Sequence, residues 1–152
     1  MNEVYFPALF PGFPLPEELA EALGRLAVVH AELDRETRTI HLDAQAEQYL
    51  AEKQLQALCR DIEKEYGLRE LKLSVRYPAS ELPNMDFRDL AQVLIRAYSP
   101  AAAILAGAKW ELDGDELHVH LAANGKAALA PHLPKGEAFL QELFGVHKTL
   151  VL

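Results

Sequence analysis

Residues 86–121 constrain the fold of this chain more than any other segment, because two helix signals and a hairpin signal follow one another within them. Asp86 is a favourable N-cap for a helix. Apolar residues then recur at helical spacing, as expected of a buried stripe: Phe87, Leu90, Val93, Leu94 and Ala97. The Ser99-Pro100 pair predicts an N-cap followed by proline at the first helical position. We therefore expect the helix to bend or restart there and to end at Gly107.

A β-hairpin is predicted directly after this bent helix. Apolar and polar residues alternate over residues 109–121, and the Asp113-Gly114 pair between the two runs is a strong turn signal. We then expect a short alanine-rich helix capped by Asn124, a second helix opened by Pro134, and a final strand at residues 147–152.

The first half of the chain predicts the same order of elements. Alternation at residues 27–33 and 38–43 predicts a half-buried antiparallel hairpin, whose first strand turns three apolar side chains to the core: Val29, Ala31 and Leu33. A helix at about residues 51–66 and a strand at residues 71–77 follow. We predict an α+β fold of two β-β-α-β units joined by the bent helix, arising by duplication or because such units are common.

The composition divides the chain into four parts. Residues 1–16 form an aromatic and proline-rich arm, residues 17–77 the first unit with a short leading helix, residues 78–85 a linker, and residues 86–152 the second unit. The aromatic residues of the arm are expected to pack on the core, with docking on a partner as the alternative: Tyr5, Phe6, Phe10 and Phe13. Because the last residues fall in an expected strand, we expect the chain to be part of a longer polypeptide.

Charge and cysteine content restrict the function classes. Asp and Glu number 23 against 15 Lys and Arg, a net charge of −8, which favours protein partners over nucleic acid. The single cysteine, Cys59, excludes an intrachain disulfide and a multi-cysteine zinc site, and its position on an apolar helix face predicts burial. Residues 101–108, the longest apolar run, are far fewer than the about 20 that span a bilayer. We expect a cytoplasmic protein.

No catalytic motif is present, and no cofactor is expected. GxSxG, Walker A and GxGxxG sequences are all missing, and the acids between Asp113 and Glu116 suit a hairpin turn better than a catalytic pair. His118 and His120 lie two residues apart on a strand and are weak candidates for metal ligands, without evident further ligands. His30 and His41 are expected to lie opposite each other on the polar face of the first hairpin. The segment is predicted not to be an enzyme.

From Asp86 onward, the predicted order of helix, hairpin, short helix, helix and strand is that of a type II KH domain. The KH fold grips RNA with a GXXG loop between its two consecutive helices. Here that junction is residues 132–136, which contain no GXXG, one lysine and a proline. A KH-like module binding single-stranded nucleic acid remains an alternative hypothesis, as does a small stand-alone metal-binding protein or enzyme.

Several segments together resemble one protein family. In chain order they are LFPG and LPEEL, the acidic hairpin ending in RTIHL, YGLRELKLSVRY, YSPAAAIL and KWELDGDELHVHL. Over about residues 10–152 the chain resembles the N-terminal region of PolC-type DNA polymerase III alpha subunits, the replicative polymerases of low-GC Gram-positive bacteria.

The resemblance implies a role in DNA replication. The full-length parent is a DNA-binding nucleotidyltransferase, a DNA-directed DNA polymerase, in which this region precedes the catalytic parts and contributes no catalytic residues. The region is similar to KH-like and clamp-loader tau-subunit-like modules. The resemblance therefore implies protein–protein contacts in the replisome, with the clamp-loader tau subunit or with other domains of the parent polymerase.

Overall fold

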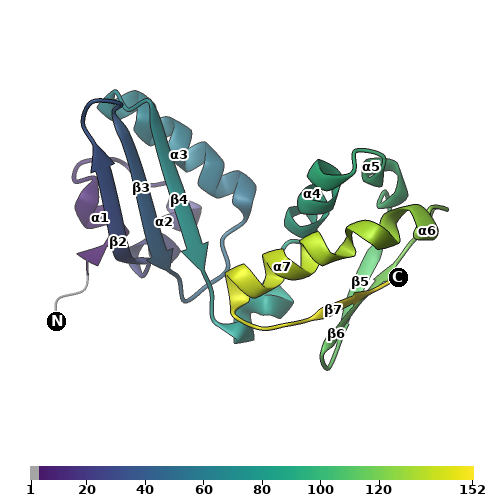
Figure 1. Ribbon diagram of the computed structural model, residues 1–152. Coiled ribbons are helices and arrows are strands. Elements are labelled where there is room, and N and C mark those ends of the chain that lie inside the picture. Colours follow the sequence, from purple (N-terminus) through teal and green to yellow (C-terminus); the bar gives the residue numbers. More distant parts are fainter. Residues whose placement is uncertain (1–3) are drawn as a thin grey trace. The chain divides into compact units, whose positions relative to one another are not determined.

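The computed structural model describes residues 4–152 and divides the chain into two compact units, the first ending at Leu82 and the second beginning at Pro83. Each unit combines helices with its own mixed sheet, so the predicted α+β fold class is confirmed (Figure 1). Within the described residues, no helix combines the length and apolar character needed to cross a bilayer.

The first unit contains a four-stranded sheet in the order β1-β2-β3-β4. Its strands are β1 (Val4–Tyr5), β2 (Ala27–Asp34), β3 (Thr39–Gln45) and β4 (Glu70–Arg76). β1 and β3 run antiparallel to β2, and β4 runs parallel to β3. The parallel pair requires a crossover connection, which a helix provides.

Three helices lie on one side of this sheet (Figure 1). They are α1 (Phe6–Leu9), α2 (Glu17–Gly24) and the crossover helix α3 (Glu52–Tyr66). The core between helices and sheet contains mainly aliphatic side chains that are almost fully buried, among them Leu23, Leu42, Leu58, Ile62 and Leu71. α3 ends at Gly67, whose φ of 65° is left-handed, as the sequence predicted.

The register of the first hairpin differs from the prediction. Asp34 pairs with Thr39, so the loop between the strands has four residues. His30 therefore lies opposite Asp43, and the predicted pairing of His30 with His41 is wrong. From His30 to Asp34 this shift of two residues leaves each side chain on its predicted face, because the side-chain period of a strand is two. The register shift between Val28 and His30 interrupts the alternation at Val29.

The N-terminal arm is part of the first unit. Phe6 and Phe10 are buried, and the Phe10 ring lies 5.5 Å from that of Tyr66, so these two aromatic residues pack on the core as expected. Tyr5 remains 41% exposed. The predicted linker at residues 78–85 is ordered: η1 (Ala79–Asn84) is a 3₁₀ helix, with Leu82 buried.

The second unit has a three-stranded sheet in the order β5-β6-β7. β5 (Lys109–Asp113) pairs antiparallel with β6 (Glu116–His120), which pairs parallel with β7 (Thr149–Val151). Its helices are α4 (Phe87–Ala97), α5 (Ala101–Ile104), α6 (Lys126–Leu129), the 3₁₀ turn η2 (Ala130–His132) and α7 (Leu133–Phe144). This order follows the predicted one; likeness to a KH domain stays a prediction.

Close approach of α7 to its neighbours defines the core of the second unit. Gly136 is buried in α7, and a Cβ there would lie 2.7 Å from Cδ1 of Leu150 and 3.1 Å from Cδ1 of Leu90. Any larger residue at this position would require the methyl groups of these buried leucines on β7 and α4 to move. Gly145 ends α7 with a φ of 67°, as Gly67 ends α3.

Three local predictions in the second unit need correction. Asp113 pairs with Glu116, so the turn consists of Gly114 and Asp115, one residue later than expected. The helix does restart after Tyr98, but Pro100 occupies the N-cap position and makes no side-chain hydrogen bond. Gly125 replaces Asn124 as the cap of α6, because its φ of 130° is accessible only to glycine.

Candidate functional site

The face of the first sheet opposite the three helices is polar and uncovered; we call it the open face. It carries side chains that alternate with the buried ones along three strands: His30, Glu32, Asp34, Thr39, His41, Asp43, Lys72, Ser74 and Arg76. At the sheet centre, the side chains of His41 and Asp43 are 41% and 45% exposed, values that a covering layer would not permit.

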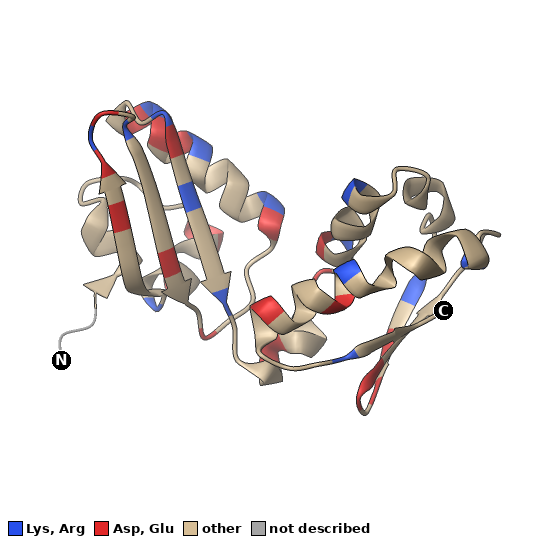
Figure 2. Cartoon of the chain, viewed as in Figure 1, with Lys and Arg blue, Asp and Glu red and all other residues tan. Residues whose placement is uncertain are grey.

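Charge is divided across the open face. β2 and β3 carry acidic residues and neither lysine nor arginine, whereas β4 carries Lys72 and Arg76 together with one acid, Glu70, at its start (Figure 2). A shallow depression of about 420 Å³ is lined by residues that include Glu32, His41 and Lys72, and a second of about 240 Å³ includes His30, Asp43 and Arg76. The depressions are open and lined by mixed charges, which suits contact with a protein surface better than enclosure of a small ligand.

Exposed large apolar side chains gather in the first unit. Of the described residues, those that are both large and exposed are Val4, Tyr5, Leu9, Val29, Leu33 and Tyr66. Val29 and Leu33 are 59% and 60% exposed. Both lie on β2, beyond the two residues that pair with β1.

The expectation that Val29, Ala31 and Leu33 turn into the core is wrong. Ala31 and Leu33 pair with Leu42 and Ile40 and so share their core-side face, yet both are exposed. Leu42 beside them is 1% exposed. The helical layer therefore covers β3 and leaves this part of β2 uncovered. Alternation in the sequence specifies the face of a side chain, but not what packs on that face.

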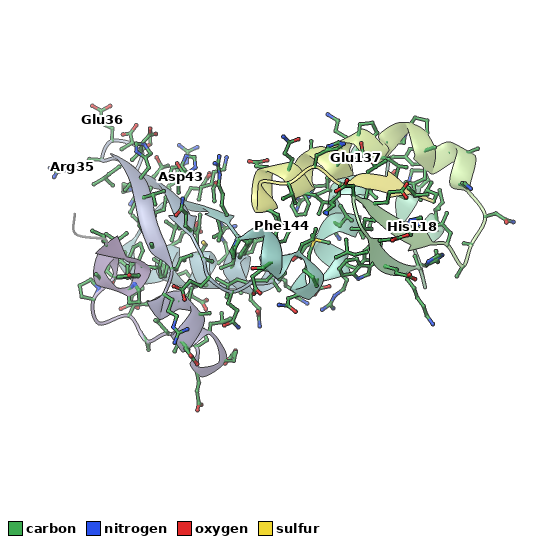
Figure 3. The ribbon with its side chains drawn as sticks, turned by 90° about the horizontal axis from the view of Figure 1, so that it is seen from below. Arg35, Glu36, Asp43, His118, Glu137 and Phe144 are labelled. Atoms are coloured by element: carbon green, nitrogen blue, oxygen red, sulfur yellow. The ribbon has the colours of Figure 1, made fainter. Side chains whose placement is uncertain are left out.

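The histidine candidates lie on the second hairpin. The rings of His118 and His120 stack with centroids 6.4 Å apart, so both emerge on one face, as expected from their spacing. His118, labelled in Figure 3, has its Nε2 3.9 Å from Asp113 and 3.6 Å from Glu116. Nε2 of His120 lies 3.7 Å from Glu111 instead. The structure brings two acids to His118 that the sequence analysis assigned to the hairpin turn and did not connect with this histidine.

The group of Asp113, Glu116 and His118 offers one imidazole and two carboxylates within 4.8 Å of one another. The Nε2 atom of His118 is buried and lacks a hydrogen-bond partner among the described residues. One imidazole and two carboxylates would need another ligand to complete the four that structural zinc sites use. Both acids are exposed at a turn, and without a rigid pocket they form a poor basis for metal catalysis.

Three titratable groups with shifted pKa values have structural roles. Burial raises the pKa of Cys59 to about 11, so the thiol stays protonated and is a poor nucleophile, and its predicted burial is confirmed. Burial also raises the pKa of Glu63, but hydrogen bonds from Leu71 N and Arg60 outweigh it and leave that pKa below its ordinary value. The Asp86 carboxylate accepts hydrogen bonds from Arg88, which lower its pKa, and caps α4.

The junction where a KH domain carries its GXXG loop has a different conformation here. α6 continues through η2 directly into α7, so residues 130–136 are helical. Gly136 is buried in packing, and Lys135 is the only lysine or arginine of the junction. Comparison of the chain with models of protein families, with curated proteins and with solved structures finds no match.

Proposed function

We propose that this chain is a non-catalytic N-terminal module of a PolC-type DNA polymerase III alpha subunit that holds the polymerase to other replisome proteins in the cytoplasm. The uncovered stretch of β2, with Val29 and Leu33 about 60% exposed, is the observation that carries a protein-binding role. Ala31 and Leu33 are exposed neighbours on one face of the sheet, and neighbouring exposed apolar side chains rimmed by polar ones are typical of interaction sites. The identity of the parent enzyme rests on the sequence resemblance, from LFPG near the start to KWELDGDELHVHL.

The proposed partners are the clamp-loader tau subunit and other domains of the parent polymerase. The net charge of −8 opposes binding to a phosphate backbone and favours a protein with basic residues. The helical junction at residues 130–136, with its single lysine, gives a KH-type nucleic-acid grip little support.

A binding experiment with three arms tests this function. The chain is titrated with the clamp-loader tau subunit, with the remaining parent polymerase, and with labelled single-stranded DNA at low salt. We expect saturable binding to at least one of the two proteins and none to the DNA. Binding to DNA alone, with a strong dependence on salt, would favour the KH-like alternative and overturn the proposal.

A further inference from the structure

Among the described residues, β1 alone pairs with the outer edge of β2, and it does so only at the start of the strand. β3 pairs with the strand from Ala27 to Asp34, but β1 pairs only with Ala27 and Val28 on the other side. Pairing with β1 stops where the β2–β3 register shifts, between Val28 and His30. Of the described residues, none continues the sheet beside residues 29–34. An edge strand of this kind presents a row of free N–H and C=O groups to a further strand.

The side chains along this edge differ between the two faces of the sheet. On the core side, the exposed Ala31 and Leu33 continue the row begun by the half-buried Ile40 and the buried Leu42. On the open face, the neighbouring positions are His30, Glu32 and Asp34. A strand added here would bury Leu33 on one face and meet two carboxylates on the other.

Glu32 on this edge is held in its charged form by a neighbouring histidine. The ring of His30 lies 3.1 Å from Oε1 of Glu32, and this hydrogen bond holds the pKa of Glu32 below its ordinary value. β2 contains neither lysine nor proline, the residues with which exposed edges are commonly protected. Figure 2 shows the acidic positions on β2, with the basic ones of β4 on the far side of the sheet.

We propose that residues 29–34 of β2 are a strand-addition site that takes an extended protein segment in which apolar and basic residues alternate. Apolar side chains of the added strand would pack beside Ala31 and Leu33, and its Lys or Arg side chains would lie beside Glu32 and Asp34. Strand addition takes affinity from main-chain hydrogen bonds and specificity from alternate side chains. The β2 strand of a second copy of this chain supplies no lysine or arginine to these acids, so charge complementarity favours a different partner.

This inference rests on the proposed function, since it places the partner of that function on one strand. It is tested first with a defined probe: a blocked peptide as long as β2 (8 residues) in which lysine and valine alternate. A peptide of the same composition, with its lysines and valines in two separate blocks, controls for charge alone. Amide NMR shifts and amide hydrogen exchange of the full chain report where the peptide binds.

We expect the alternating peptide to shift and protect the amides of residues 29–34, and the block peptide to bind at least tenfold more weakly. Leu33→Lys and Glu32→Lys should each weaken binding of the alternating peptide about tenfold. Lys72→Glu on β4 and Leu9→Lys on α1 are matched controls that should leave it within about twofold. Equal binding of both peptides, or protection of other amides, would overturn the inference.

The same four variants are then tested against the protein partner. If wild type binds the partner and Leu33→Lys and Glu32→Lys bind it equally well, the strand-addition site is refuted while the proposed function stands. If wild type binds no replisome protein, the proposed function fails, and the peptide result alone decides whether the edge accepts a strand. Protection of residues 29–34 that rises with chain concentration, without peptide, would identify a second copy as the occupant and overturn the inference.

Discussion

The two units of this chain pack a helix on a small sheet in nearly the same way. Each places a hairpin, a helical crossover and a parallel strand in that order. In each, a helical glutamate accepts a hydrogen bond from a backbone N–H of the last strand: Glu63 from Leu71 N at 2.7 Å, and Glu137 from Leu150 N at 2.8 Å (Figure 3 labels Glu137). These bonds fix the helix against the strand that it precedes.

The units differ in what covers the first strand of the hairpin. In the second unit Trp110 of β5 stacks on Phe87 of α4, with ring centroids 6.4 Å apart, and Leu112 is half-buried. In the first unit Val29 and Leu33 of β2 are exposed. Similar element order thus gives both units an edge strand, but the core-side face of β5 is packed against a helix, whereas Ala31 and Leu33 on the core-side face of β2 are exposed. The strand with the exposed face is where we place the partner.

The largest effect on stability is expected at Gly136. Of the described glycines, the one that lets a helix pack closely on its neighbours belongs to the second unit. Gly136→Val should lower the free energy of unfolding by about 3 kcal/mol, since its Cβ would lie within 3 Å of Leu150. Gly24→Val, with nothing within 4 Å of its Cβ position, should change it by no more than about 0.5 kcal/mol. Chemical denaturation measures both, and equal losses would show that the packing contrast is wrong.

The second-largest effect on stability is expected at Glu63, whose hydrogen bond with Leu71 N links α3 to β4. Glu63→Gln should lower the free energy of unfolding by about 1.5 kcal/mol at neutral pH, because a charged acceptor of hydrogen bonds from Leu71 N and Arg60 becomes neutral. Since the folded pKa of Glu63 is lowered, its contribution is complete above the ordinary pKa of a glutamate and is lost as pH falls through the folded pKa.

The difference between wild type and Glu63→Gln should therefore shrink progressively below about pH 5. Denaturation curves at a series of pH values measure it. Glu65→Gln, an exposed change on the same helix, is the control and should have little effect at any pH. A difference that persists unchanged into acid would contradict the role assigned to the Glu63 carboxylate.

A smaller effect on stability is expected from helix capping, in which the two units also differ. Asp86 caps α4 by accepting a hydrogen bond from Arg88 N at 3.0 Å, whereas Ala51 at the start of α3 provides no side-chain cap. Asp86→Ala should lower stability by about 1 kcal/mol, and Ala51→Asp should raise it by about 0.5 kcal/mol. Melting temperatures of the two variants should move in opposite directions, and a shift of both in one direction would refute the assignment.

The smallest effect is expected from zinc. Asp113, Glu116 and His118 are too few to complete a structural site, and both acids are exposed. We expect equimolar zinc to leave the melting temperature of wild type and of a His118→Ala, His120→Ala double variant equally unchanged. A rise in wild type that the double variant lacks would establish a metal site on the second hairpin.

The ends of the longer helices were the part of this structure that the sequence predicted well, whereas the turn at Gly114 and the cap of α6 were each misplaced by one residue. Gly67 and Gly145 end helices, and Asp86 begins one, because backbone conformation and capping depend on neighbouring residues. The exposure of Val29 and Leu33 was not predictable, since it depends on how far the helical layer extends over the sheet. The approach of Asp113 to His118 was likewise missed, because it follows from a turn that lies one residue later than expected.

Amide hydrogen exchange of the whole chain, with and without the protein partner, tests the central claim most directly. Residues 29–34 of β2 should gain protection when the clamp-loader tau subunit or the remaining polymerase binds, and the edge strand β5 of the second unit should not. Protection confined to the second unit, with β2 unchanged, would contradict the claim that the uncovered edge is the docking site.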